Sequence, residues 1–345
     1  MNIAVFTDKF SGTLTAHEVI DVIKENFGNF NIEADFFCVT DGGQESIEIF
    51  KSYGFKTDSQ YEELNCDGVY KNIETLNINK EIYFESAQLI GIDSKLKAKD
   101  INSSSLTNIL NKVQVLGTGG SKTIDFGIGI LSSLGMEFIS NGQTISDPKP
   151  KDFPFIDKVN ASSFDTDLDL KVLSDTHISL LGDNSCFDIF GPQKGLSTAD
   201  IQNHKQQVAR LIGLIETELK LDLNPQQKSS GAAGGLTFTL NQILGCEVLN
   251  GPDYFLKQTG LLNKLKKYDI GIFCEGKFDE SSLKGKIIGK LLSDFKGDSY
   301  FLGGQYKAKE KFFKYTFECG VEGLDQPKLS LSKTTKELIK ILQMD

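Results

Sequence analysis

The stretch of sequence that decides the fold is residues 2–28, NIAVFTDKFSGTLTAHEVIDVIKENFG. Residues 2–7 form a short β-rich apolar run, which predicts a strand. Thr15 and Glu18 have the spacing of a capping box and precede apolar residues at helical intervals. They predict the start of a helix, with Gly28 as its natural end. The stretch therefore predicts a strand, a loop and a helix in succession.

The same succession recurs along the chain. Further strands are expected at residues 34–39, 113–116 and 269–274, and the helices that follow them at residues 46–53, 123–134 and 286–295. This alternation predicts parallel sheets with helices on both faces. Residues 69–77 and 81–86 instead alternate around a polar turn, which predicts an antiparallel excursion, and we expect a domain change near residues 60–68.

Composition excludes several classes of protein. The 345 residues carry 47 acidic and 37 basic side chains, a net charge of −10 that would repel nucleic acid. No apolar run approaches the ~20 residues of a membrane span, and no signal peptide follows Met1, so a cytoplasmic location is expected. The six cysteines lack C-x-x-C spacing and are expected to be buried free thiols.

Glycine recurs in the loops that follow predicted strands, beside carboxylates, hydroxyls or lysines. These loops lie at residues 41–43, 119–125, 191–195, 275–279 and 303–304. Ligands of open α/β sheets bind outside the carboxyl ends of the strands, and glycine lets the backbone approach an anion closely. The loops together predict a ligand that carries a phosphate or a carboxylate.

Each of these loops also has a purely structural interpretation. Residues 119–121 suit a tight turn as well as a phosphate cradle, and residues 231–235 favour close helix packing over anion binding. Asp41 could cap the helix after it, whereas Asp175 after an apolar strand favours a functional role. Most lysines are expected at the solvated surface, with Lys194, between glycines and after a proline, as the exception.

Two common nucleotide-binding patterns are absent. Gly271, Gly276 and Lys277 have the spacing of a P-loop, but Phe278 stands where a hydroxyl must bind magnesium. No G-x-G-x-x-G follows the first strand, which argues against nicotinamide chemistry. Phosphoryl transfer without a P-loop remains, and it needs cations, metal-binding carboxylates and a carboxylate base.

Several segments, in this order, resemble the motifs of the glycerate kinase family, in the class that lacks a P-loop and is usually a glycerate 2-kinase. They are DKFSGTLTA at residues 8–16, TDGG at 40–43, FESA at 84–87, GGSKTID at 119–125, FGPQKG at 190–195, GAAGG at 231–235, EGKFD at 275–279 and KGK at 284–286. The fifth and sixth match the family pattern outright. The resemblance extends from residue 1 to about residue 304.

The resemblance implies ATP- and magnesium-dependent phosphorylation of an alcohol group, with D-glycerate converted to 2-phosphoglycerate. It also implies an α/β fold of two domains with the active-site cleft between them. We expect residues 1–65 plus 250–345 to form a Rossmann/flavodoxin-like domain with a doubly wound parallel sheet, and residues 66–249 to form an inserted α/β domain with a mixed sheet. The expected partners are a small hydroxy acid and a nucleotide, with a homodimer as the oligomeric state to test.

The residues that match the family's motifs are assigned roles accordingly. The catalytic residues are Asp41, Asp175, Lys194 and Asp279. The nucleotide and phosphate are assigned to Gly119, Gly120, Ser121, Gly231, Gly234 and Lys286. The acceptor substrate is assigned to Asp8, Lys9, Ser11, Asp125 and Lys277, and magnesium to Asp175 and Glu275.

The chain departs from the family within these motifs. The family's Cys-Asp-Val-Asp-Asn-Pro becomes SDTHIS at residues 174–179, which removes a carboxylate and an amide, and the family's Asn becomes Ile124. Ser11 stands for a lysine and Lys277 for an arginine. A site that loses polar partners binds its ligand poorly. Two alternatives therefore stand beside a glycerate kinase: a kinase of a different small hydroxy or sugar acid, and a catalytically weakened ligand-binding paralogue.

Overall fold

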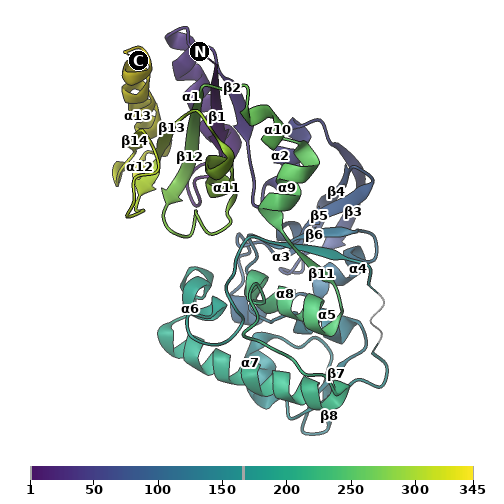
Figure 1. The fold of residues 1–345 in the computed structure, drawn as a ribbon. Coiled ribbons are helices and arrows are strands. Elements are labelled where there is room, and N and C mark those ends of the chain that lie inside the picture. Colours follow the sequence, from purple (N-terminus) through teal and green to yellow (C-terminus); the bar gives the residue numbers. More distant parts are fainter. Residues whose placement is uncertain (1, 165–167, 345) are drawn as a thin grey trace. The chain divides into compact units, whose positions relative to one another are not determined.

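A computed structural model describes residues 2–164 and 168–344; Met1, which begins the first expected domain, residues 165–167 and Asp345, which ends the chain, lie outside the described residues. The chain divides into two compact units. Unit 1 consists of Met1–Asp41, Glu48–Gly54 and Pro252–Asp345, and unit 2 of Gly42–Ile47 and Phe55–Gly251. Figure 1 labels the elements of both.

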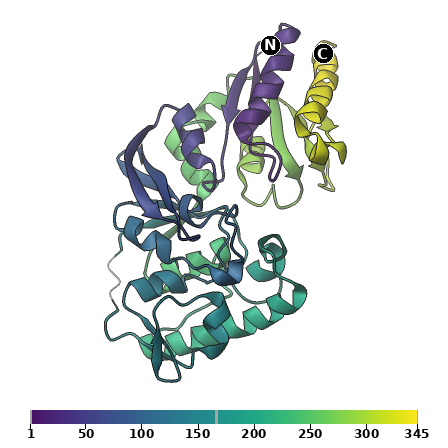
Figure 2. The ribbon, with the colours of Figure 1, turned by 180° about the vertical axis from the view of Figure 1, so that it is seen from behind.

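Unit 1 contains a five-stranded, entirely parallel sheet in the order β14-β13-β12-β1-β2. The strands are β1 (Ile3–Thr7), β2 (Asp35–Cys38), β12 (Ile270–Phe278), β13 (Asp298–Tyr306) and β14 (Tyr315–Glu318). The helices are α1 (Ala16–Asn29), α10 (Leu262–Leu265), α11 (Ile287–Asp294), α12 (Glu322–Asp325) and α13 (Pro327–Leu342), while α2 (Ser46–Ser52) and α9 (Gly251–Thr259) include residues of both units. The helices α1 and α13 pack side by side against the sheet, as Figure 2 shows.

The first strand and helix form as their sequence predicts. All five residues of β1 are buried, as in a parallel sheet covered on both faces. The capping box forms as well: the Glu18 amide donates to Thr15 Oγ1 over 3.2 Å, and the Thr15 amide donates to Glu18 Oε2 over 3.1 Å. This pair satisfies two amides that the first turn of α1 would leave unpaired.

Unit 2 contains a six-stranded mixed sheet in the order β11-β10-β6-β5-β4-β3 and a small antiparallel sheet in the order β8-β7-β9. The strands are β3 (Lys56–Leu64), β4 (Tyr70–Ile78), β5 (Glu81–Glu85), β6 (Val115–Gly117), β7 (Glu137–Ser140), β8 (Gln143–Ile145), β9 (Lys158–Asn160), β10 (Lys171–Ser174) and β11 (Glu247–Asn250). Strands β3, β4 and β5 are antiparallel neighbours, and the other pairs of the large sheet are parallel. The predicted α/β fold, with one parallel and one mixed sheet, is confirmed.

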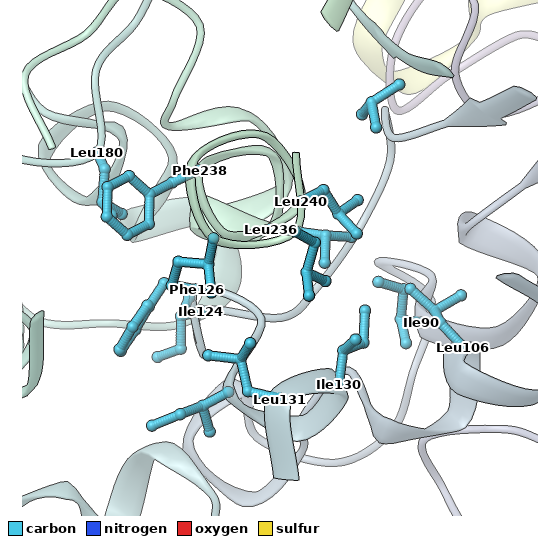
Figure 3. Packing of buried hydrophobic residues seen from close by; sticks show 14 of the residues in the cluster. Ile90, Leu106, Ile124, Phe126, Ile130, Leu131, Leu180, Leu236, Phe238 and Leu240 are labelled. Atoms are coloured by element: carbon cyan, nitrogen blue, oxygen red, sulfur yellow. The ribbon is translucent and has the colours of Figure 1, made fainter. Parts of the chain in front are cut away.

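The helices of unit 2 are mostly short. They are α3 (Ala87–Ile90), α4 (Thr107–Leu110), α5 (Ile128–Ser133), α6 (Cys186–Phe190), α7 (Thr198–Leu219) and α8 (Leu236–Phe238), with 3-10 turns at Ala98–Asp100, Ser104–Leu106, Pro150–Phe155, Pro192–Lys194 and Ala232–Gly235 and a π-helical turn at Thr239–Ile243. Figure 3 shows the core between α5 and α8, where Ile124 and Phe126 pack against Leu131 and Leu236.

The helix predicted at residues 123–134 begins later than expected, at Ile128. Phe126 and Gly127 have φ values of +42° and +85°, in the left-handed region that a right-handed helix excludes. Asp125 accepts hydrogen bonds from the amides of Gly127 and Gly129, so its side chain competes with the regular pattern of the first turn. The expected helix was therefore wrong over its first five residues.

Two further observations concern the class of protein. None of the helices in residues 2–164 and 168–344 is long and apolar enough to cross a membrane. All six cysteines are free thiols; Cys66 and Cys319 are partly exposed and the others are buried.

Candidate functional site

Two predicted carboxylates meet at the carboxyl ends of neighbouring strands in unit 1. Thr7 of β1 pairs with Cys274 of β12, and the Asp8 amide donates to the Cys274 carbonyl over 3.1 Å. This register brings Asp8 beside Glu275. Lys286, which precedes α11, has its Nζ 3.6 Å from Glu275 Oε1. We call Asp8, Glu275 and Lys286 the carboxylate cluster.

The carboxylate cluster is poorly satisfied for its degree of burial. Glu275 is 5% exposed, and its Oε2 accepts no hydrogen bond from any described residue. Burial raises the pKa of Glu275 to about 7, against the opposing charge of Lys286. Burial likewise raises the pKa of Asp8 to about 7, against the charge of Lys9. Such a site is typical of one that takes up a proton or a cation.

Asp41 lies in the same unit and caps a helix. Its Oδ1 accepts a hydrogen bond of 2.8 Å from the amide of Ile287, the first residue of α11. From the sequence, Asp41 was a candidate cap for α2, the next helix in the chain. Its hydrogen bond is made to α11 instead. Asp41 therefore connects the loop after β2 with the loop that carries Lys286.

Lys277 and Asp279 form an ion pair at the end of β12. Lys277 Nζ lies 2.8 Å from Asp279 Oδ2, and the Lys277 side chain is 59% exposed. Burial opposes the charge on Asp279, but hydrogen bonds from Lys277 and Ser281 outweigh it and lower the pKa of Asp279 to about 2. Of the other substrate candidates, Lys9 is half-buried and Ser11 is exposed.

The glycine loop of unit 2, residues 119–121, follows β6 and packs closely on another predicted loop. A Cβ added to Gly43 would lie 2.6 Å from the Gly119 Cα, so this approach requires glycine. Gly120 has a φ of +83°, and its carbonyl accepts from the Ile92 amide. Among the described residues, the amides of Gly119 and Gly120 donate no hydrogen bond to the protein. This arrangement fits an anion as well as a turn.

Asp125 and Lys194, also in unit 2, are both buried, and other residues of the protein supply their hydrogen-bond partners. Asp125 Oδ2 accepts from the Ser103 amide (2.8 Å), the Ser103 hydroxyl (2.7 Å) and the Gly129 amide (3.1 Å). Lys194 Nζ donates to the Thr123 carbonyl over 2.8 Å. Burial raises the pKa of Asp125 and lowers the pKa of Lys194 to about 8.

Gly231 and Gly234 both lie where the backbone is crowded. A Cβ on Gly231 would lie 2.4 Å from the Ser179 carbonyl oxygen, and one on Gly234 would lie 2.0 Å from the Thr123 carbonyl oxygen. These contacts favour the close-packing interpretation of this segment. Anion binding by Gly231 and Gly234 stays a prediction.

Asp175 and the altered residues near it lie at the end of β10. Asp175 is half-buried and His177 is exposed. Ile178 donates its amide to Thr176 Oγ1 over 3.2 Å, so this loop is closed by a bond of its own. Ile124, the other altered position, is 1% exposed and packs in the core.

Three residues with buried polar contacts were missing from the sequence-based assignment. Glu85 accepts a hydrogen bond of 2.5 Å from the Ile47 amide, at the start of α2. Ser103 binds Asp125, and His204 Nε2 lies 2.8 Å from the Ile124 carbonyl oxygen. Glu85 belongs to the quoted segment FESA and could have been found there. Ser103 and His204 carried no comparable signal.

The carboxylates of the described residues do not form a complete magnesium site by themselves. Within residues 2–164 and 168–344, no group of three or more histidines, cysteines and acids is arranged to hold a metal ion. The unpaired Oε2 of Glu275 nevertheless fits an oxygen-seeking cation. Asp175, its predicted partner, belongs to unit 2.

Comparison with known proteins identifies the family. A sequence profile described as "Glycerate kinase family" matches residues 3–311. The chain belongs to the glycerate kinase family. Glycerate 2-kinase of Escherichia coli (strain K12) is 26% identical to it over 312 residues, which cover 83% of this chain and 80% of that protein. Glycerate kinase of Halalkalibacterium halodurans is 30% identical over 175 residues, which cover 50% and 46%.

A solved structure agrees on the fold. The crystal structure of a putative glycerate kinase 2 from Salmonella typhimurium LT2 has a TM-score of 0.70 and 20% identity, and the likeness covers 100% of this chain and 98% of that chain. The low identities make this chain a divergent member of the glycerate kinase family. Membership supports a kinase as the class of protein, with a small molecule and a nucleotide as its ligands.

Proposed function

We propose that this chain is an ATP- and magnesium-dependent kinase that converts D-glycerate to 2-phosphoglycerate. The observation that carries the proposal is the carboxylate cluster, where Glu275 is buried beside Asp8 and Lys286 with one oxygen unpaired. Phosphoryl transfer needs such a combination of carboxylate and cation around the phosphate. The E. coli relative, which is named a glycerate 2-kinase, supports the choice of substrate.

In this proposal the two units supply different parts of the chemistry. The amides of Gly119 and Gly120 bind nucleotide phosphate, and Lys286 neutralises charge on the transferred group. Glu275 would hold magnesium, which shields the negative charge of the phosphates when bound. Magnesium binding by Asp175 stays a prediction from the resemblance. Lys277, whose side chain is exposed, would pair with the carboxylate of the acid.

A carboxylate must accept the proton of the acceptor hydroxyl. A bond forms between the hydroxyl oxygen and the γ-phosphorus, the bond from that phosphorus to the bridging oxygen breaks, and the hydroxyl proton passes to the base. Asp41 and Asp279 are the two candidates. Asp41 is the better one, because the pair with Lys277 and the pKa of about 2 make Asp279 a weak base.

The test is the release of ADP from ATP and Mg²⁺, coupled to lactate dehydrogenase, with D-glycerate present and absent. Glycerate-dependent release is expected, and ³¹P NMR of the product then distinguishes the 2-phosphate from the 3-phosphate. A folded sample that binds nucleotide but gives no glycerate-dependent ADP would contradict the proposal. Sedimentation of the same sample checks the predicted homodimer.

A different acceptor acid is the second candidate. The observation that favours it is the burial of the Ile124 side chain, which presents an apolar core residue where the family has an amide. The loop at residues 174–179 also favours a different acceptor, because the Ile178 amide is already bonded to Thr176 Oγ1 within the loop. A panel of small hydroxy and sugar acids tests it, and turnover of one of them in preference to glycerate would support it. Nucleotide binding without turnover of any acid would favour the weakened paralogue instead.

A further inference from the structure

Residues 123–126, which we call the clamped segment, run from the glycine loop to the start of α5. Three of its carbonyl oxygens accept hydrogen bonds from buried side chains of other elements. The pairs are Thr123 with Lys194 (2.8 Å), Ile124 with His204 (2.8 Å) and Phe126 with Thr239. The fourth residue, Asp125, is held through its carboxylate by Ser103. Every residue of the segment therefore has a hydrogen bond with a side chain from another part of unit 2.

His204 occupies a position where a purely apolar residue would pack as well. It lies on the buried face of α7 with Ile201 and Val208, and its ring stacks on Phe153 with a centroid distance of 5.6 Å. Its ring also packs perpendicular to that of Phe187, with a centroid distance of 4.7 Å. What the imidazole adds to this apolar environment is a donor for the Ile124 carbonyl.

The neutral form of His204 provides that donor. Burial lowers the pKa of His204 to about 4, so the ring is uncharged near neutral pH. Because the Ile124 carbonyl can only accept, the proton of the neutral ring resides on Nε2. Loss of this donor would leave a buried carbonyl oxygen without a partner.

The backbone of the clamped segment requires support. Phe126 has a φ of +42° and is followed by Gly127 at +85°, and a bulky residue adopts the left-handed region only when its surroundings hold it there. Thr239 and the Gly234 carbonyl bind the two backbone polar groups of Phe126. Strain of this kind is typical of loops whose geometry matters to a ligand.

We propose that His204 and Lys194 are positioning residues, which hold the clamped segment and so keep the amides of Gly119 and Gly120 in place for nucleotide phosphate. The proposal rests on the proposed function for the identity of that ligand. The proposal also replaces the catalytic role that the sequence predicted for Lys194. Among the described residues its ammonium donates to the Thr123 carbonyl, so it would hold the loop in place.

The decisive comparison is between His204→Phe and His204→Gln. Phenylalanine keeps the ring and removes the donor, whereas the glutamine amide restores a donor at the place of Nε2. His204→Phe should raise KM for ATP about tenfold and leave kcat within about twofold. The reason is that an unpaired buried carbonyl at Ile124 destabilises the loop conformation that binds ATP. His204→Gln should keep KM within about twofold of the wild type. His17→Phe, at an exposed histidine of α1, is the matched control.

Hydrogen exchange supplies a readout that does not depend on activity. Amides of residues 119–126 should exchange faster in His204→Phe than in the wild type, and His204→Gln should restore their protection. A purely structural role predicts a different pattern, because a smaller folded fraction lowers the apparent kcat and leaves KM unchanged. Unchanged KM and unchanged exchange in a folded His204→Phe protein would overturn the proposal.

Lys194→Met provides the second variant if His204→Phe does not fold. Raised KM for ATP with faster exchange of residues 119–126 supports positioning. A lower kcat with unchanged KM for ATP and unchanged exchange of residues 119–126 would show that Lys194 acts on the transferred phosphate. That result would overturn the proposal. If the wild type turns over no acid, the proposed function fails, while exchange and the dissociation constant for ATP still decide this inference.

Discussion

The carboxylate cluster of unit 1 and the clamped segment of unit 2 both bury polar groups after a strand, yet they differ in how those groups are satisfied. Glu275 Oε2 accepts no hydrogen bond from a described residue. Asp125 Oδ2 accepts three. A buried polar group with its partners in place stabilises the fold, whereas one without them costs free energy unless a ligand supplies the partner. Glu275 Oε2 therefore has room for a partner from outside the protein, whereas Asp125 Oδ2 already has partners within it.

The largest effect is expected for Glu275→Gln. Removal of this carboxylate should lower kcat at least about 100-fold, as for loss of one charge that acts on the transition state. The free energy of unfolding should stay unchanged or rise, because a buried charge is removed. The ADP assay and urea unfolding measure the two quantities, with the exposed Glu337→Gln of α13 as the control. Normal turnover in Glu275→Gln would remove the carboxylate cluster from the reaction.

Glu275 and His204 should also contribute to the pH dependence of stability with opposite signs. Glu275 has a pKa of about 7 in the folded state and 4.5 as its ordinary value, so between those pH values the folded state binds the extra proton. The free energy of unfolding therefore falls by about 3 kcal/mol as pH rises through that window. His204, at about 4 against 6.5, binds its proton in the unfolded state first, so its contribution rises with pH by about 3 kcal/mol between those values.

Two variants separate these opposing contributions. In the absence of divalent cations, the free energy of unfolding of the wild type minus that of Glu275→Gln should fall as pH rises from 4.5 to 7, and the same difference for His204→Gln should rise from pH 4 to 6.5. Urea unfolding at a series of pH values measures both slopes. The same pH dependence of both differences would show that the two groups do not titrate as their burial implies.

A smaller effect is expected for Asp125→Asn. The asparagine amide would face the donors of Ser103 and Gly129, so the free energy of unfolding should fall by about 2 kcal/mol. Asp58→Asn, at an exposed position of β3, should change it by less than about 0.5 kcal/mol. If Asp125→Asn abolished turnover without loss of stability, Asp125 would belong with the ligand-binding carboxylates.

The smallest effect is expected for Lys277→Met. Its ion pair with Asp279 is exposed on the lysine side, so the free energy of unfolding should change by less than about 0.5 kcal/mol. KM for glycerate should rise by about threefold if the ammonium pairs with the acid in solvent. Lys284→Met, at another exposed lysine of the following loop, is the control. A drop in kcat alone would argue against a role in binding the acid.

The sequence predicted the elements whose signals are local. The capping box of Thr15 and Glu18 starts α1, and the polar turn near residue 79 separates β4 from β5. It missed β3 (Lys56–Leu64), which alternates weakly and pairs with β4 as an edge strand. It also began α5 too early, because the left-handed backbone of Phe126 depends on Thr239, 113 residues away.

In the candidate site, too, local signals could be read from the sequence and contacts between distant segments could not. Motif matching could name Asp125, Lys194 and Glu275, because their neighbours in the chain resemble the family's segments. It could not tell which of them is satisfied by the protein, since Asp125 is bound by Ser103 and Lys194 by Thr123, both from other segments. His204 was missed for the same reason, as its partner is 80 residues distant.

The sequence by itself therefore determined the family, the alternation of strands and helices and the set of loops that carry polar residues. The family follows from the resemblance of motifs, and the other two follow from periodicity, capping and glycine placement, which act over a few residues. Only the tertiary structure decided that Glu275 retains an unpaired oxygen while Asp125 and Lys194 form hydrogen bonds with other segments of the protein. Burial and hydrogen-bond partners are set by which distant segments meet, and the chemistry available to a side chain depends on both.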